Sequence, residues 1–201
     1  MKDLNTGQID VNSYFDLKIQ TFDLNKIDGC YCISKYKAPE MYLLPESASF
    51  SCDIWSVGCI LYELLTKKQL FEGNSTINML QKFVDTIGTP KDNDLFYVKN
   101  PQTIESMNSI QKVGDSNIDN LIQNASSDEI DFFKSMMNWN HNKRISVEEA
   151  PNHLYFKKFH DHLDEPSAPK IEALDIKMNK SDFKEKFWNG IQRIKETNNF
   201  K

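Results

Sequence analysis

Apolar residues recur at helical spacing in four stretches of the chain. The stretch Cys52–Leu65 is apolar on almost every face, which predicts a helix buried nearly all round. A second helix is predicted over about Ile77–Ile87, because Gly88-Thr-Pro90 follows it as a stop signal. Two further helices are predicted to be amphipathic: Ser127–Met137, with acids in its first turn, and about Ser181–Lys195.

The first quarter of the chain shows weaker patterns. Two short runs, Ile9–Val11 and Leu17–Gln20, are strand-like. Residues 25–50 are predicted to be a loop that contains a short helix after Pro39.

The middle of the chain is harder to assign. Residues 91–125 are rich in Asn, Asp and Ser, and their apolar residues have no firm period. Further on, Ser146-Val-Glu-Glu149 is typical of a capping box that opens a helix. Pro151 falls in the second turn of that helix, where we expect it to strain or shorten the helix.

Asp53 stands in the first turn of the most apolar predicted helix. Ser51 is well suited to cap this helix, and an acid in the first turn complements the helix dipole. A carboxylate at the mouth of a buried helix is nevertheless costly unless it is hydrogen-bonded. Two interpretations therefore stay open at this point: Asp53 only caps the helix, or it holds another piece of backbone in place.

The composition predicts a globular chain with a substantial core. Of the 201 residues, 39% are hydrophobic and 11% are aromatic, which suits one or two folded domains. The net charge of -5 argues against a nucleic-acid binder, because such proteins usually carry a basic excess. The sequence shows no signal-peptide pattern at its start, and its longest apolar run is too short to cross a bilayer.

The cysteine and histidine spacings do not predict a metal site. Cys52 and Cys59 lie in or beside the apolar helix and are expected in the core. Cys30-Tyr-Cys32 could bind a metal, but no second pair stands at zinc spacing. His160-Asp-His162 lies on a polar tail, where such histidines are usually solvated. We therefore expect no metal site and a reduced, intracellular chain.

Three motifs stand in the order that eukaryotic protein kinases show: Ala38-Pro-Glu40, Asp53-Ile-Trp-Ser-Val-Gly58 and Asn142-Lys-Arg-Ile145. Together they resemble the C-terminal lobe of a eukaryotic protein kinase. Closer details resemble the MAP kinases (mitogen-activated protein kinases): Tyr36-Lys-Ala-Pro-Glu40, Leu70-Phe-Glu-Gly73, Ile87-Gly-Thr-Pro90 and His160-Asp-His-Leu-Asp-Glu-Pro-Ser-Ala168. The resemblance covers nearly the whole chain outside residues 91–125.

The resemblance implies a mainly α fold, in which a helical bundle has a short β-hairpin at its N-terminal end. Residues 1–158 would form the kinase-like lobe, and 159–201 would form a C-terminal extension. Within the lobe, residues 1–8 correspond to the catalytic loop, 21–40 to the activation segment, and about 90–125 to an insert of the MAP kinase type. The glycine-rich loop and the strand lysine of the N-terminal lobe are not found in the sequence, so we expect that lobe to be absent.

Three residues are expected to hold the lobe together, as the resemblance implies. The family's aspartate at the position of Asp53 accepts hydrogen bonds from the backbone of the catalytic loop, which favours the second interpretation of Asp53. Glu40 is expected to form a buried salt bridge with Arg144. The scaffold of the lobe is therefore expected to be intact.

The residues at the family's catalytic positions have changed. Asp3 matches the catalytic aspartate, but Asn5 replaces the phosphate-contacting lysine and Gln8 replaces the metal-binding asparagine. Thr21 replaces the magnesium-binding aspartate of the Asp-Phe-Gly motif. Asp23 lies two residues further on and is not expected to point at the same place.

The activation segment has also lost residues of the family. Asp28-Gly-Cys30 replaces the phosphorylated Thr-x-Tyr motif, and Ile33 replaces a threonine that bonds the catalytic loop. Ser34 and Lys35 replace an Arg-Trp pair beside the substrate's proline pocket. The metal, nucleotide, activation and substrate sites have thus all changed, so no cofactor is expected for this chain, although ATP and Mg²⁺ serve the family.

An acidic segment after the lobe is the first candidate surface for partners. Asp161, Asp164 and Glu165 match the spacing of the docking patch of MAP kinases. Such a patch attracts Lys- and Arg-rich peptides with weak, salt-sensitive energies. The alternative is a solvated acidic tail.

The last predicted helix is the second candidate surface. Its apolar face contains Phe183, Phe187, Trp188, Ile191 and Ile194. In the family, the equivalent helix packs against the N-terminal lobe, so this face is expected to need that lobe or a partner to cover it.

Two hypotheses follow for the function. The first is a truncated and degenerate MAP-kinase-like protein, a pseudokinase C-terminal lobe that serves as a binding or scaffold module in cytoplasmic or nuclear signalling. The second is a serine/threonine protein kinase whose N-terminal lobe is absent from this sequence. Protein partners are expected in both cases, and neither nucleic acid nor membrane is expected.

Overall fold

A computed structural model describes residues 4–14, 16–19, 34–47, 49–158, 160–161, 184–185 and 187–189. The chain divides into two units, Met1–His160 and Asp161–Lys201, and each is treated by itself below. The α-helices of the first unit are α1 (Pro39–Leu43), α2 (Ser51–Thr66), α3 (Thr76–Ile87), α4 (Pro101–Asn108), α5 (Ile118–Leu121) and α6 (Ser127–Met136). The two strands are β1 (Ile9–Val11) and β2 (Leu17–Ile19).

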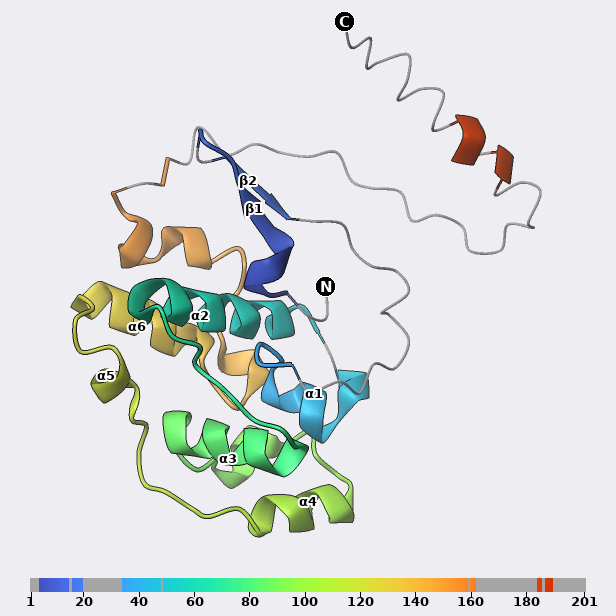
Figure 1. Ribbon diagram of the computed structural model, residues 1–201. Helices are drawn as coiled ribbons and strands as arrows, with labels where there is room; N and C mark the ends of the chain where they lie inside the picture. The colour runs from blue at the N-terminus through green and yellow to red at the C-terminus, as the bar shows by residue number, and fades with distance from the viewer. Residues whose placement is uncertain are drawn as a thin grey trace, which may run out of the picture. The chain divides into compact units, whose positions relative to one another are not determined.

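Short 3-10 helices connect these elements. They are η1 (Thr6–Gln8), η3 (Pro45–Ser47), η4 (Asp92–Leu95), η5 (His141–Lys143), η6 (Ala150–Asn152) and η7 (Leu154–Phe156). The described part of the chain is therefore mainly helical, as the sequence predicts (Figure 1). No helix within it is both long enough and apolar enough to span a bilayer.

The hairpin of β1 and β2 stands at the start of the first unit. The two strands pair antiparallel, with Ile9 opposite Ile19 and Val11 opposite Leu17. Both strand-like runs of the sequence are thus confirmed, apart from Gln20, which lies outside the described residues. Val11 and Leu17 remain 58% and 60% exposed, so this face of the hairpin is uncovered by the described residues.

The core of the first unit forms around α2. This helix contacts α6, and α1 contacts α3 (Figure 1). Three aromatic side chains are fully buried there: Trp55 of α2, Phe71 of the loop after α2, and Phe83 of α3. The ring centroids of Trp55 and Phe71 are 5.7 Å apart, and those of Phe71 and Phe83 are 4.6 Å apart. Burying such large aromatic side chains contributes strongly to stability, so these rings fix α2 against α3.

The ends of the predicted helices follow local capping chemistry. In α3, the Ser75 side chain accepts a hydrogen bond from the Asn78 amide, and Gly88 ends the helix with a φ of 85°. In α6, Ser126 and Glu129 form a reciprocal capping box. The predicted bounds of α2, α3 and α6 are confirmed to within one residue at each end.

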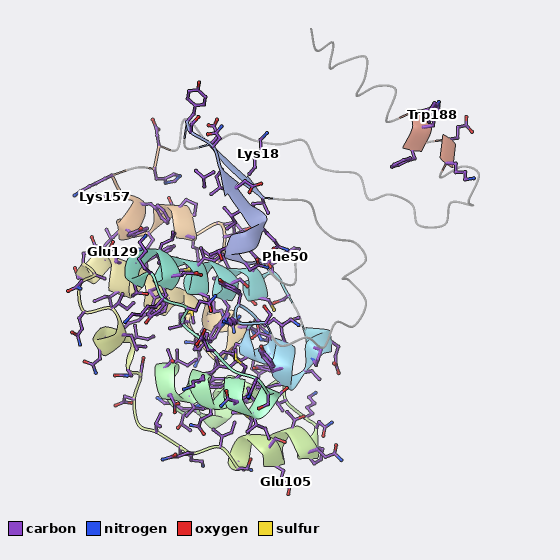
Figure 2. The ribbon with its side chains drawn as sticks, viewed as in Figure 1. Lys18, Phe50, Glu105, Glu129, Lys157 and Trp188 are labelled. Atoms are coloured by element: carbon purple, nitrogen blue, oxygen red, sulfur yellow. The ribbon has the colours of Figure 1, made fainter. Side chains whose placement is uncertain are left out.

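The expectation that Ser51 caps α2 is wrong, whereas the expected shortening of the helix at Pro151 is confirmed. Ser51 does not cap α2, because it is the first helical residue and its hydroxyl lies 2.7 Å from that of Ser49. The residue before it, Phe50, is 88% exposed (Figure 2) and offers no side-chain cap. The capping box of Ser146 and Glu149 does form, but only a 3-10 turn with Pro151 at its centre follows, because proline cannot donate the next helical hydrogen bond.

Residues 91–125 contain three helical pieces that their weak periodicity did not reveal: η4, α4 and α5. Asn100 caps α4 by accepting a hydrogen bond from the Gln102 amide, and Pro101 is its first residue. This cap is a sequence signal that could have located α4. Of the predicted helix Ser181–Lys195, the structure describes residues 184–185 and 187–189, which are helical.

Candidate functional site

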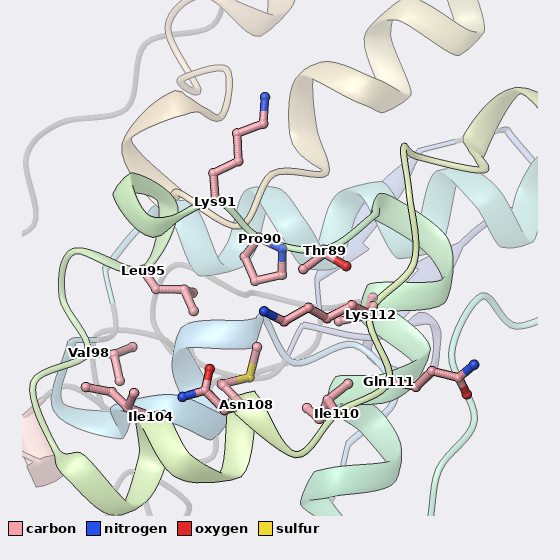
Figure 3. A pocket seen from close by; sticks show the side chains of 12 residues that line it. Thr89, Pro90, Lys91, Leu95, Val98, Ile104, Asn108, Ile110, Gln111 and Lys112 are labelled. Atoms are coloured by element: carbon pink, nitrogen blue, oxygen red, sulfur yellow. The ribbon is translucent and has the colours of Figure 1, made fainter.

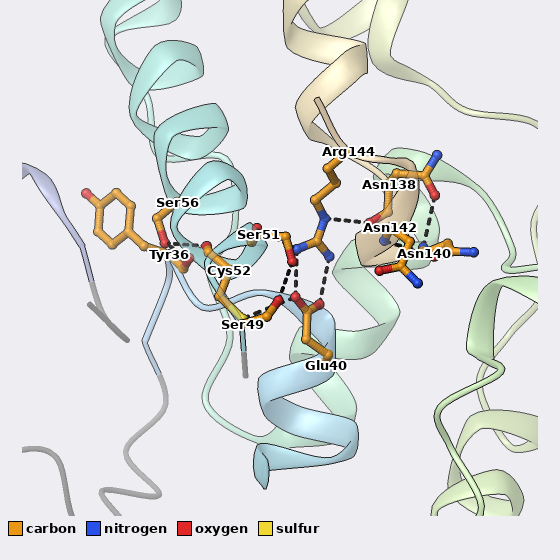
Figure 4. A network of polar contacts seen from close by, with 10 residues as sticks. All are labelled: Tyr36, Glu40, Ser49, Ser51, Cys52, Ser56, Asn138, Asn140, Asn142 and Arg144. Atoms are coloured by element: carbon orange, nitrogen blue, oxygen red, sulfur yellow. Dashed lines mark hydrogen bonds and ion pairs between the residues drawn. The ribbon is translucent and has the colours of Figure 1, made fainter. Parts of the chain in front are cut away.

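The buried charge pair Glu40–Arg144 lies at the centre of the site (Figure 4). Glu40 is on α1, and Arg144 directly follows η5, more than a hundred residues later in the chain. Two parallel hydrogen bonds of 2.7 Å join the guanidinium to the two carboxylate oxygens, and both side chains are 0% exposed. The structure thus brings together two of the residues that the sequence singled out.

The remaining donors of Arg144 bind backbone. Its Nε donates to the Asn138 carbonyl at 2.9 Å, and its Nη1 donates to the Ser51 carbonyl at 2.9 Å. The guanidinium also lies over the Trp55 ring, 5.0 Å from its centroid. Arg144 therefore links the start of α2 to the segment after α6, and each buried donor involved in these contacts is satisfied.

Burial and charge act against each other in this pair. Burial raises the pKa of Glu40, but the hydrogen bonds and positive charge of Arg144 outweigh this effect and hold the pKa below its usual value. Cys52 donates its thiol to Glu40 Oε1 at 3.2 Å. Burial, together with the Glu40 charge, raises the pKa of the Cys52 thiol to about 12. Cys52 is therefore a protonated donor to the pair, and its thiol is a poor nucleophile.

Asp53 lies in the first turn of α2, and its Oδ1 atom is closed to solvent. Burial raises the pKa of this carboxyl above its usual value. The predicted partner is the backbone of residues 1–8, of which residues 1–3 lie outside the described part. The role of Asp53 as a clamp on that segment stays a prediction.

The start of the chain places Asn5 and Gln8 around η1. The Asn5 side chain caps this turn by accepting a hydrogen bond from the Gly7 amide at 3.0 Å. Gln8 ends the turn, and its Oε1 atom is buried without a hydrogen-bond partner among the described residues. Asp3 and Thr21 lie outside the described residues, so the structure does not place the catalytic aspartate position or the magnesium position.

Tyr36 connects this turn to α2, a role that the sequence did not reveal. Its hydroxyl donates to Glu63 Oε2 at 2.7 Å and lies 3.0 Å from Thr6 Oγ1. Its carbonyl accepts from the Ser56 hydroxyl at 2.9 Å. Burial, with the Glu63 carboxylate, raises the pKa of Tyr36 above its usual value. These partners are far apart in sequence, so no local pattern indicates that they meet.

Lys35 is the second connection that sequence reasoning missed. Its ammonium lies 2.9 Å from Glu72 Oε1 and also donates to the Gln69 side chain. The sequence predicts that Lys35 replaces the family's aromatic residue beside the substrate's proline pocket. The end of the predicted activation segment is therefore joined to the loop after α2 through polar contacts.

The candidate partner surfaces lie in the second unit and are described only in part. Asp161 is placed, whereas Asp164 and Glu165 lie outside the described residues. Phe187 and Trp188 are 63% and 59% exposed within their own unit; Phe183 and Ile191 also lie outside the described part. Both the acidic docking patch and the apolar helix face stay predictions.

The donor set that the sequence predicts at the family's magnesium positions does not fit that ion. Gln8 offers a neutral amide oxygen and Thr21 a neutral hydroxyl, whereas protein sites for Mg²⁺ are usually built on one or two carboxylates. Elsewhere in the described residues, no group of three His, Cys, Asp or Glu side chains could hold a metal ion.

Comparison with known proteins gives consistent matches. Residues 16–156 match the family described as "Protein kinase domain". The chain is 33% identical over 192 residues to Mitogen-activated protein kinase hog-1 of Neurospora crassa. The aligned region covers 93% of this chain and 53% of that protein. For Mitogen-activated protein kinase HOG1 of Cochliobolus heterostrophus, the identity is 32% over 192 residues, covering 93% and 54%.

A protein of a third organism gives a similar match. The chain is 33% identical over 174 residues to Extracellular signal-regulated kinase 1 of Dictyostelium discoideum, which covers 82% of this chain and 33% of that protein. The chain therefore spans about half the length of the first two relatives and a third of this one.

Proposed function

From the premise that this chain belongs to the protein kinase family, as a MAP-kinase-like member, we propose that it is a pseudokinase module. In this proposal the chain folds as a kinase C-terminal lobe, binds protein partners in signalling and does not transfer phosphate. ATP and Mg²⁺ are the cofactors of the family, and this chain is proposed to use neither.

The observation that carries this proposal is the neutral donor set at the two magnesium positions. Phosphoryl transfer depends on metal ions that bridge the phosphate oxygens and neutralise the developing charge. Thr21 and Gln8 provide no negative charge for such ions. The Gln8 amide oxygen is moreover closed to solvent, so a metal from solution would have to displace the residues that cover it.

A second observation supports the loss of phosphate binding. Asn5 stands at the position of the phosphate-contacting lysine and carries no positive charge. Its side chain instead caps η1 through the Gly7 amide. By contrast, the Glu40–Arg144 pair, which stabilises the lobe, has both hydrogen bonds and full burial. The proposal therefore combines a retained scaffold with altered chemistry.

The partners proposed are proteins. The acidic segment Asp161, Asp164 and Glu165 is proposed to bind Lys- and Arg-rich peptides. The apolar face with Phe183, Phe187, Trp188 and Ile191 is proposed to be covered by a partner or by a kinase N-terminal lobe, because exposed apolar surface of this kind marks an interaction site.

A thermal melting experiment tests the loss of nucleotide binding. We expect the melting temperature of the full chain to be the same with and without millimolar ATP and Mg²⁺, because a ligand that does not bind the native state cannot stabilise it. An active MAP kinase melted in parallel is the positive control, and its melting temperature should rise. A magnesium-dependent rise for this chain would contradict the proposal.

A second candidate function is serine/threonine protein kinase activity, carried by a longer polypeptide that includes this chain. The observation that favours it is length, since the first two relatives are matched over only 53% and 54% of their residues. The missing part would have to supply the nucleotide cradle of the family. The melting experiment repeated on that longer polypeptide separates the candidates, because an active kinase would be stabilised by ATP with Mg²⁺.

A further inference from the structure

A pocket of about 270 Å³ lies between α3, the segment that leads into η4, and α4 (Figure 3). It is separate from the Glu40–Arg144 site. Its apolar part is lined by Val84, Leu95, Val98, Ile104, Met107 and Ile110. The mouth is open to solvent, and Ile104 at its edge is 43% exposed. The first unit thus presents a concave apolar surface that none of the proposed functions above uses.

The wall of this pocket is held in place by two pairs of hydrogen bonds. The Gln81 side chain donates to the Gln111 carbonyl at 3.0 Å and accepts from the Gln111 amide at 2.9 Å. In the same way, the Thr89 hydroxyl donates to the Val113 carbonyl at 2.7 Å and accepts from the Val113 amide at 2.9 Å. Because this wall is already fixed, the protein would lose less conformational entropy when a ligand binds.

The charge of the lining is opposite to that of the whole chain. The net charge of the chain is -5, yet the residues that line the pocket include Lys91 and Lys112 and no acid. Figure 3 shows the Lys112 side chain extending across the pocket, whereas Lys91 points away from it. Among the described residues, none forms an ion pair with Lys112. An anionic group beside the pocket would therefore meet an ammonium that is not already neutralised by a salt bridge.

The size of the pocket favours one inserted side chain. An apolar cavity of about 150 Å³ accommodates a benzene ring, whereas pockets for whole small molecules usually measure about 300–1,000 Å³. A volume of about 270 Å³ therefore suits a single large apolar side chain better than a complete small-molecule ligand. Anchor side chains that fill such pockets supply most of the affinity at protein interfaces.

We propose that this pocket docks an acidic peptide segment of a protein partner, which inserts one Leu, Ile or Phe side chain and places its carboxylates beside Lys112. The proposal rests on the binding role proposed above, but it concerns a different surface. This surface would bind acidic partners, whereas the acidic segment at Asp161 is proposed to bind basic ones. The chain would then have two docking surfaces that select partners of opposite charge.

Selection from a random dodecapeptide library displayed on phage tests this proposal with the full chain as the target. We expect enriched peptides in which Asp and Glu flank one large apolar residue. Their affinity should fall about tenfold or more for Ile104→Glu and for Lys112→Glu. The matched control is Lys157→Glu, an exposed lysine on the far side of the unit from α4 (Figure 2), which should bind the peptides as the parent does.

The other outcomes overturn the proposal in distinguishable ways. Enrichment of basic peptides whose binding is insensitive to Ile104→Glu and Lys112→Glu would leave the binding role standing but remove the pocket from it. No enrichment of any peptide would argue against both the pocket and the binding role. Binding of decanoate, in place of any peptide, with loss in Ile104→Glu, would reassign the pocket to a small amphiphile. Circular dichroism of each variant verifies that it is folded.

Discussion

Of the described ion pairs, Glu40–Arg144 is the one whose disruption is expected to lower the free energy of unfolding most. For Arg144→Leu, we expect the free energy of unfolding at neutral pH to fall by about 3–5 kcal/mol, because Glu40 keeps a buried and unpaired charge. The matched control is Lys134→Ala, which breaks an ion pair of similar length between Lys134 and Asp119. In that pair the Lys134 side chain is 41% exposed and the Asp119 side chain is 63% exposed. That change should cost less than about 1 kcal/mol. Urea unfolding measures both, and equal losses would contradict the prediction.

The pH dependence of stability gives a second readout of the same pair. Burial raises the pKa of Glu40, but Arg144 lowers this pKa by more than burial raises it. The folded-state pKa therefore lies below the ordinary value of 4.5. A carboxyl with a lowered folded-state pKa contributes stability that is present above the unfolded pKa and is lost as the pH falls through the folded pKa. The difference in unfolding free energy between the parent and Glu40→Gln should therefore shrink once the pH falls below about 4.5.

At the scale of elements, the close approach of the α3 terminus to the segment after α4 depends on one glycine. Gly88 has a φ of 85° and a ψ of 169°, a region that is nearly restricted to glycine. A Cβ there would lie 2.9 Å from the Gly114 carbonyl oxygen and 3.2 Å from the Ser116 amide nitrogen. Gly88→Ala should therefore lower the free energy of unfolding by about 1–3 kcal/mol, as measured by urea unfolding.

Gly114 provides the matched control for this prediction. A Cβ at Gly114 would meet no heavy atom within 4 Å, and its φ is not in the left-handed region. Gly114→Ala should change stability by less than about 0.5 kcal/mol. If both substitutions were neutral, the contact between the two segments would not depend on the conformation at Gly88.

The sequence predicted elements where the signals were local. In α3, the apolar spacing, the Ser75 cap and the Gly88 stop coincide, so the helix could be bounded within one residue. In α4, only Met107 is buried, so the apolar pattern was too sparse to be recognised. The capping box at Ser146 forms as predicted, and Pro151 shortens the segment after it to a 3-10 turn, which the sequence also predicted.

The candidate site divides in the same way. Glu40 and Arg144 were found because both lie in motifs of the family, and the structure joins them. The contacts of Tyr36 with Glu63 and Thr6 span 27 and 30 residues, and hydrogen-bonding side chains of this kind are common in any sequence. Such pairs are set by tertiary packing, so a pattern read along the chain contains no signal for them.

At the scale of the whole molecule, the charge distribution predicts which peptides the acidic segment binds. A short Lys- and Arg-rich peptide should bind the full chain at low salt and dissociate as the ionic strength rises, because the Debye length falls from about 30 Å at 0.01 M to about 8 Å at 0.15 M. Neutralising Asp161, Asp164 and Glu165 together, as Asn, Asn and Gln, should weaken this binding at low salt. Fluorescence anisotropy of the labelled peptide measures both effects.

The control must separate a local patch from the overall negative charge of -5. A variant that neutralises the exposed acids Glu105, Asp128 and Glu148 instead has the same net charge as the first variant. If the patch is local, this control binds the basic peptide more tightly than the first variant does, because only the first variant has lost the carboxylates proposed to contact the peptide. Equal weakening by both variants would show that only the overall charge attracts the peptide. Lys112→Glu should leave the basic peptide's affinity unchanged, because the pocket is proposed to select acidic segments.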